Sequence, residues 1–153
     1  MAESQVKFSL LKIYVKDLSF ETSNSPHMFL EKWDEWNPEV DLQLSNKVKV
    51  LKDNIHEIVL ELTVTAKMND KMIFLVEVQL AGIFDIMISD KDKRDMWMGG
   101  ACLQVLFPYA REVVSDVVTR GGFPQLLLSP VNFASLYRQH LEESKAEQSN
   151  SGE

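Results

Sequence analysis

The first half of the chain alternates between apolar and polar residues with a period of two. This alternation runs over residues 40–50, 58–66 and 71–88, and it is typical of strands that bury one face. Gly82 interrupts the last of these stretches and predicts a β-bulge there. Residues 8–17, FSLLKIYVKD, predict a fourth strand. The polar stretch 68–71 predicts a tight hairpin between two of these strands, so the pattern favours an antiparallel sheet with one buried face.

The second half changes to helical spacing. Over residues 95–119 the apolar positions cover most of the circumference of a predicted helix, and Pro108 should kink it or begin a new segment. The Gly121-Gly122 pair predicts the end of this helix, and Asn132 is a good N-cap for a final helix. Strands followed by helices indicate an α+β fold.

A helix that is apolar on two sides needs cover on both of them. The sheet supplies one cover, and a chain of 153 residues has little left to supply the other. We therefore infer a second subunit. The length favours one domain, which we expect at residues 8–143, between a flexible tail at 1–7 and a polar, disordered tail at 144–153.

Composition and charge narrow the classes of function. Sixteen basic and 23 acidic residues give a net charge of −7, which argues against binding of nucleic acid or of an anionic membrane. One cysteine and three widely spaced histidines predict neither a disulfide nor a metal site. The chain shows no apolar run of membrane-spanning length and no secretory signal. We expect a cytoplasmic protein without cofactors and without direct membrane insertion.

Known catalytic motifs are missing from the sequence, so we do not expect an enzyme. Cys102 lies in an apolar helical stripe, which indicates a buried and inert thiol. Asp90 and Asp92 fall in the mixed-charge run SDKDKRD, which predicts a solvated loop. Gly99-Gly100 and Gly121-Gly122 are interpreted as turn and cap glycines.

Two other features allow more than one interpretation. The face of the long strand that should point to solvent mixes Leu75 and Ile83 with Glu77 and Gln79; these residues are either scattered exposed side chains or a docking patch. The long connection 20–40 carries several aromatic residues. They either plug the edge of the sheet or line a groove for apolar side chains.

The chain resembles the SecB family of bacterial export chaperones. The resemblance covers most of residues 8–141 and is carried, in order, by IYVKDLSFETSNSPHMF (13–29), WNPEVDLQL (36–44), IVLELTVTA (58–66), FLVEVQLAGIF (74–84), LFPYAREVVSDVVTRGGFPQL (106–126) and SPVNFASLY (129–137). It implies a four-stranded antiparallel sheet with a long, kinked or broken helix and a C-terminal helix packed on one face. Segments 31–33 (EKW) and 90–105 depart from the family pattern.

The resemblance also implies a function and partners. SecB-like proteins hold unfolded preproteins in the bacterial cytosol without nucleotide or covalent chemistry, and deliver them to the SecA motor. SecA docks through its basic, zinc-bearing C-terminal tail. The family's docking positions match Asp17, Glu21, Leu75 and Glu77.

The same resemblance implies client positions and a homotetramer built as a dimer of dimers with the long helix at its centre. The client-groove candidates are Phe20, Phe29, Trp36, Leu42, Leu44 and Phe74. The oligomer-interface candidates come from one apolar stripe of the predicted long helix and are Cys102, Val105, Tyr109 and Val113. Two alternatives remain: a SecB-like chaperone dedicated to an antitoxin or another specific client, and a small-ligand-binding or enzymatic α+β domain.

Overall fold

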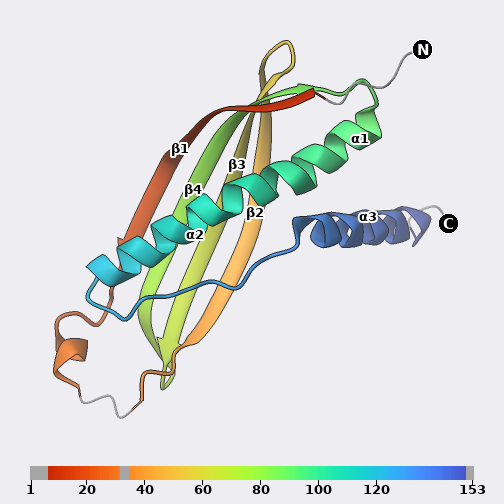
Figure 1. Cartoon of the computed structure of the whole chain (residues 1–153). Coiled ribbons are helices and arrows are strands. Elements are labelled where there is room, and N and C mark those ends of the chain that lie inside the picture. Colours follow the sequence, from red (N-terminus) through yellow and green to blue (C-terminus); the bar gives the residue numbers. More distant parts are fainter. Residues whose placement is uncertain (1–6, 32–34, 151–153) are drawn as a thin grey trace.

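A four-stranded antiparallel sheet forms the framework of the protein. The computed structural model describes residues 7–31 and 35–150. The strands lie in the order β1-β4-β3-β2, so β1 and β2 are the edges and every neighbouring pair is antiparallel (Figure 1). Their bounds are Lys7–Glu21 for β1, Glu39–Lys52 for β2, Ile55–Met68 for β3 and Lys71–Met87 for β4. The predicted α+β fold and antiparallel sheet are confirmed.

The hairpin between β3 and β4 forms where the sequence predicts it. Asn69 and Asp70 both have positive φ values, 53° and 63°, as in the two-residue turns whose twist matches that of the flanking strands. The connection between β1 and β2 is longer and contains a short 3-10 helix, η1, at His27–Leu30. Lys32 and Trp33 of the divergent EKW segment lie outside the described residues.

The bulge predicted at Gly82 is wrong. Gly82 pairs in regular register with Ile13 of β1 and Ile58 of β3. A Cβ atom at Gly82 would lie 2.6 Å from the ring of Phe84 and 2.8 Å from Leu106. The glycine is therefore required by close packing of a helix on the sheet, and the irregularities of the β1–β4 ladder lie in β1 instead.

One long helical segment crosses the sheet diagonally (Figure 1). It consists of α1 (Lys91–Met96), a π-helical turn η2 (Trp97–Ala101) and α2 (Cys102–Arg120). Pro108 lies inside α2 without ending it, so the irregular turn falls at η2. The segment around Asp90 is exposed, as predicted, but the prediction of a loop is wrong. Asp90 caps α1 by accepting a hydrogen bond of 3.0 Å from the backbone N–H of Asp92.

The ends of the two long helices follow the predicted capping pattern. After α2, the N–H of Phe123 donates to the carbonyl of Val118 and the N–H of Gly122 donates to the carbonyl of Thr119, with Gly122 at a φ of 92°; this is a Schellman C-cap. Asn132 caps α3 (Phe133–Asn150) by accepting from the N–H of Ser135.

Two predictions about the helices differ from the structure. Residues 144–150 form the last turns of α3, where the sequence predicted a disordered tail. Gly99 and Gly100 lie in η2 rather than in a turn. A Cβ atom at Gly99 would lie 2.5 Å from the ring of Tyr137, so the glycine pair allows α3 to pack closely against η2.

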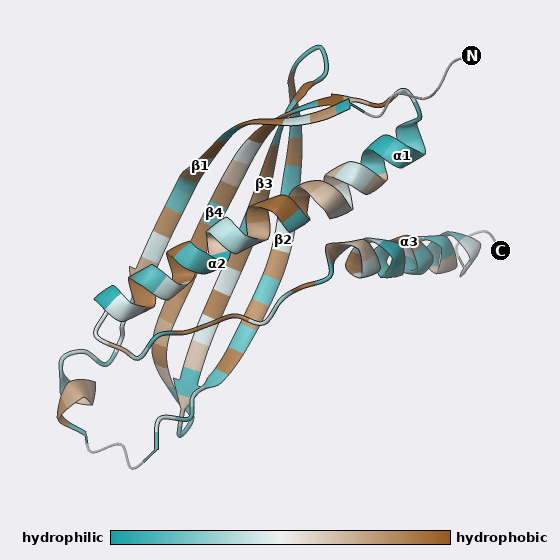
Figure 2. Cartoon of the chain, viewed as in Figure 1, coloured by the Kyte–Doolittle hydropathy of each residue, from teal (hydrophilic) through white to brown (hydrophobic). Residues whose placement is uncertain are grey.

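The hydrophobic core lies between the sheet and α2. The apolar side chains of β3 and β4 that face α2 are buried, and hydrophobic residues, brown in Figure 2, recur along these strands and along α2. Cys102 is completely buried, as predicted. Both long helices lie on the same side of the sheet in Figure 1, and the opposite side is called the open face below. The sheet therefore offers two chemically different surfaces.

Candidate functional site

The four predicted docking residues lie together on the open face. Glu21 of β1 is directly opposite Leu75 of β4, and Glu77 is opposite Ser19 on the same ladder. Asp17 is opposite Gln79, one step further along. Directly opposed side chains on one face of an antiparallel pair lie about 5 Å apart at Cβ. The acidic patch, defined here as Asp17, Glu21, Leu75 and Glu77, is therefore a continuous surface, with all three carboxylates exposed.

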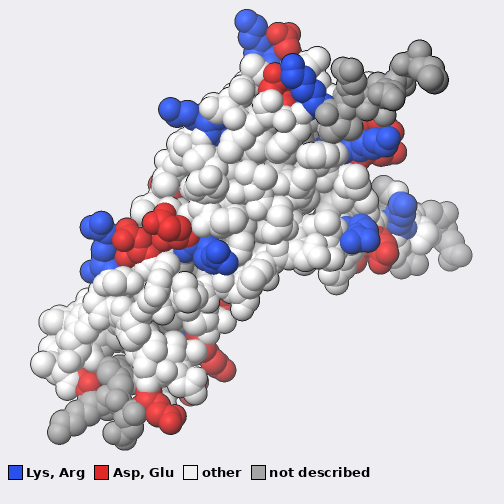
Figure 3. Space-filling model, viewed as in Figure 1, with Lys and Arg blue, Asp and Glu red and all other residues white. Residues whose placement is uncertain are grey.

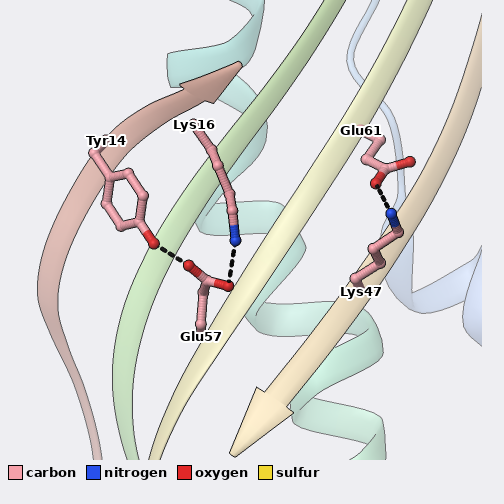
Figure 4. Close-up of polar contacts among 5 residues, drawn as sticks. All are labelled: Tyr14, Lys16, Lys47, Glu57 and Glu61. Carbon is pink, nitrogen blue, oxygen red and sulfur yellow. Dashed lines mark hydrogen bonds and ion pairs between the residues drawn. The ribbon is translucent and has the colours of Figure 1, made fainter. Parts of the chain in front are cut away.

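A hydrogen-bonded network crosses the open face beside the acidic patch. Tyr14 and Lys16 extend from β1 over β4 to Glu57 on β3 (Figure 4). The Lys16 Nζ lies 2.8 Å from Glu57 Oε1, and the Tyr14 hydroxyl donates to Glu57 Oε2. The Glu57 side chain is only 12% exposed, and both of its carboxylate oxygens are thus paired.

Polar contacts on the open face shift the pKa values of the groups that make them. The hydrogen bond from Lys16, followed by that from Tyr14, lowers the pKa of Glu57. Desolvation, together with the adjacent carboxylate, raises the pKa of Tyr14 to about 12. A second acid on β3, Glu61, pairs with Lys47 at 3.0 Å, and this hydrogen bond lowers its pKa.

Four of the predicted client residues meet around Phe123. The ring centroid of Phe123 lies 5.3 Å from that of Phe74, 5.4 Å from Phe29, 5.9 Å from Trp36 and 6.5 Å from Phe20. Distances of this size are those of favourable aromatic pairs. We call these five residues the aromatic cluster. They come from separate segments of the chain, so only the tertiary structure brings them together.

Sequence reasoning missed Phe123. Its position immediately after Gly121-Gly122 is the signal that could have found it, because the residue at this point of a Schellman cap is commonly an apolar contact. The same glycines leave room for the cluster. A Cβ atom would lie 2.4 Å from the Phe20 ring at Gly121 and 3.1 Å from the Phe29 ring at Gly122.

The members of the aromatic cluster differ in exposure. Phe74 is 1% exposed, and Phe123 is also buried, so these two rings support the cluster from below. Phe29 is 49% exposed, and its neighbour Leu30 is 81% exposed. The cluster therefore presents an apolar surface at the end of the sheet where η1 lies.

The remaining client candidates, Leu42 and Leu44, lie on β2 and not in the aromatic cluster. They are half-buried and pack against the core from the helix side of the sheet. Leu44 also lines a groove of about 670 Å³ between β2 and α3, together with Tyr137 and His140. The structure thus divides the predicted client residues between two apolar regions.

The interface candidates on α2 are also divided. Tyr109 is 50% exposed, and Val105 and Val113 are half-buried, on the outer side of the helix. Cys102 is instead in the protomer core, where burial raises the pKa of its thiol to about 12, so its side chain is not available to a partner. Charged side chains gather over the C-terminal half of α2 in Figure 3, and the surface beside them is largely uncharged.

The described part of the chain contains no group of three or more histidine, cysteine, aspartate or glutamate residues placed to hold a metal ion. Within the same residues, no helix is long and apolar enough to cross a membrane.

Comparison with known proteins places the chain in a family. The profile described as "Preprotein translocase subunit SecB" matches residues 1–144. The chain belongs to the SecB family. It is 54% identical over 142 residues to the protein-export protein SecB of Nitrosococcus oceani, covering 93% of this chain and 86% of that protein. It is 47% identical over 141 residues to the SecB of Methylobacillus flagellatus, covering 92% and 88%.

A solved structure agrees at the level of the fold. The SecB-like chaperone of Mycobacterium tuberculosis, determined in complex with a peptide from an antitoxin, superposes with a TM-score of 0.67 at 16% identity. The match covers 81% of this chain and 90% of that one. The SecB-like fold and the assignment to a protein-export chaperone family, both predicted from the sequence, are confirmed.

Proposed function

We propose that this SecB protein is an ATP-independent holdase that binds unfolded preproteins in the bacterial cytosol and delivers them to SecA. The observation that carries this proposal is the separation of two surfaces on one sheet. An acidic patch lies on the open face, and the aromatic cluster lies on the side of the helices. A client and a motor protein would then bind at the same time without competing for one surface.

The aromatic cluster suits clients of varied sequence. Unfolded preproteins share exposed apolar side chains and an extended backbone, and large aromatic rings bind such side chains without demanding a particular one. Phe29 and Trp36 supply accessible ring area, and the buried Phe74 and Phe123 hold them in place. Leu44 and the groove beside α3 extend the apolar surface along β2.

The acidic patch suits the basic, zinc-bearing tail of SecA. Carboxylates at Asp17, Glu21 and Glu77 would steer a basic segment to the sheet, and Leu75 would supply an apolar contact among them. The zinc would belong to SecA. A chaperone dedicated to an antitoxin needs no such patch, so the patch favours the export role over that alternative.

The assembly we propose is a homotetramer, a dimer of dimers. The outward side of α2 carries Val105, Tyr109 and Val113, and the neighbouring edge strand β1 exposes Leu10, Val15 and Leu18 beside it. An uncovered apolar surface that combines a helix face with a sheet edge is typical of an interface between subunits.

Two measurements test this function. Purified protein should delay the refolding of a denatured precursor in the absence of ATP, and unchanged refolding in its presence would contradict the holdase role. For docking, Glu77→Lys should abolish binding of the zinc-loaded SecA C-terminal peptide in isothermal titration while the refolding delay stays intact. Asp85→Lys is the matched control, with the same charge reversal on the same strand about 26 Å away.

A further inference from the structure

An extra residue in β1 decides which side chains of this strand reach the open face. Tyr14 lies opposite Ala81, Val15 opposite Leu80, and Asp17 already opposite Gln79. Lys16 is therefore the inserted residue of a β-bulge, the kind of irregularity that re-aims side chains next to functional sites.

The bulge has a direct effect on the acidic patch. With strict alternation from Tyr14 on the open face, Asp17 and Glu21 would point toward the helices. Because Lys16 is inserted, both acids lie on the open face, opposite Gln79 and Leu75, and Phe20 lies on the helix side. The same bulge thus supplies two residues to the docking patch and one to the aromatic cluster.

The inserted residue is held by a side chain from another strand. Lys16 donates to Glu57 Oε1 at 2.8 Å, and Tyr14, two residues earlier, donates to Glu57 Oε2. Glu57 is on β3, so both contacts span the intervening strand β4 (Figure 4). Glu57 therefore binds β1 at the bulge and again two residues before it.

We infer that Lys16, Glu57 and Tyr14 form a positioning network that fixes the β1 bulge and thereby holds Asp17 and Glu21 in the SecA-docking patch. This inference rests on the proposed docking function of the patch. None of the three residues needs to contact SecA, because they act through the course of the β1 backbone.

The direction in which one substitution changes the affinity for the SecA tail separates this positioning role from a purely electrostatic effect. Lys16 is a positive charge next to a patch that binds a basic tail. If charge alone mattered, Lys16→Gln should tighten binding of the tail, because a repulsive charge is removed. If Lys16 positions the patch, the same substitution should weaken binding.

The control lies on the same strand. Lys12 is opposite Ile83 on the open face, is exposed, and makes no ion pair with a described residue. Lys12→Gln removes the same charge without touching the Glu57 network. Lys16→Arg keeps the charge and the capacity to bind a carboxylate, so it should retain binding.

The test is isothermal titration of the zinc-loaded SecA C-terminal peptide, with the refolding delay of a denatured precursor as the check that each variant is folded. We expect Lys16→Gln to raise the dissociation constant about fivefold or more, Lys12→Gln to leave it equal or lower, and Lys16→Arg to stay near the wild type. Glu57→Gln, which removes the partner instead, should weaken binding like Lys16→Gln.

The results that would refute the positioning network differ from those that would refute the docking function. Equal or tighter binding by Lys16→Gln overturns the positioning role, and so does a loss in Lys16→Arg as large as that in Lys16→Gln. If Glu77→Lys binds the peptide as well as the wild type, the docking function of the patch is itself wrong. If Glu77→Lys abolishes binding while Lys16→Gln and Glu57→Gln do not weaken it, docking stands and the positioning network is refuted.

Discussion

Phe123 is the residue at which loss of one ring should disturb the client surface most. Phe123→Leu keeps an apolar side chain after the α2 C-cap but removes the ring that lies between the rings of Phe20, Phe29, Trp36 and Phe74. The exposed rings would then lose their common support, and we expect weaker client holding.

The size of the effect follows from the ring contacts. Each aromatic pair contributes about 0.5–1.5 kcal/mol beyond its buried area. Phe123 makes four such pairs with described residues, but pairs that share one ring are not additive. We expect the free energy of unfolding to fall by about 2 kcal/mol, and the thermal midpoint to fall by about 4–8 °C.

The matched control is Phe107→Leu. Phe107 is 2% exposed and Phe123 is 5% exposed, so both are buried. Phe107 lies outside the aromatic cluster, and among the described residues its ring contacts one other ring, that of Phe133, at 5.6 Å. Both variants should lower the thermal midpoint, measured at one protein concentration because an oligomer's stability depends on it. Only Phe123→Leu should weaken client binding, by about tenfold, or about 1.4 kcal/mol.

The client assay is the refolding delay of a denatured precursor, titrated with chaperone well below both thermal midpoints. If Phe107→Leu weakened holding as much as Phe123→Leu, the loss would come from general destabilisation. If Phe123→Leu held the client as well as the wild type, the aromatic cluster would not be the client surface. Either result refutes the reasoning.

Three further predictions concern assembly and titration. We expect the wild type and Tyr109→Phe to form the proposed tetramer in native mass spectrometry and Tyr109→Asp to form smaller species. A tetramer in both variants would exclude the outward side of α2 as an interface. The pKa of Tyr14 in the folded protein, about 12, lies above its ordinary value of 10.0. The contribution of the protonated Tyr14 to the free energy of unfolding is therefore fully present below pH 10 and is lost as the pH rises through about 12. The stability difference between wild type and Tyr14→Phe in urea titrations should therefore shrink over this range, and a constant difference would contradict the Tyr14 assignment. Cys102, buried and with a pKa of about 12, should react with a thiol reagent only after unfolding, and rapid labelling of the native protein would place it at the surface.

Much of the fold was predictable because the buried face of a strand or helix requires apolar residues at regular spacing in the sequence. The alternation over residues 40–50, 58–66 and 71–88 marked β2, β3 and β4, since one face of each strand packs toward the hydrophobic core. Glycine after α2 and asparagine before α3 marked helix ends through local capping. These signals need only neighbours in the chain.

Other features of the structure could not be predicted from local sequence patterns. Five of the six residues of α1 are charged and none of the six is buried, so the sequence predicted a loop in this segment. Gly82 looked like a bulge because its packing partner, Leu106, is on a distant helix. The acidic patch was predicted by resemblance, and its geometry depends on an inserted residue in β1 that interrupts the two-residue period.

The sequence by itself determined the class of fold, the three regular strands, the helix caps and the family, because these depend on local periodicity, local hydrogen bonds and residues that match along the chain. The tertiary structure decided which residues act together. Phe123 joins rings from β1, η1, β4 and the segment before β2, and Glu57 holds the β1 bulge from across β4. Contacts between segments far apart in the chain depend on how the strands and helices pack, and residue spacing does not record that packing.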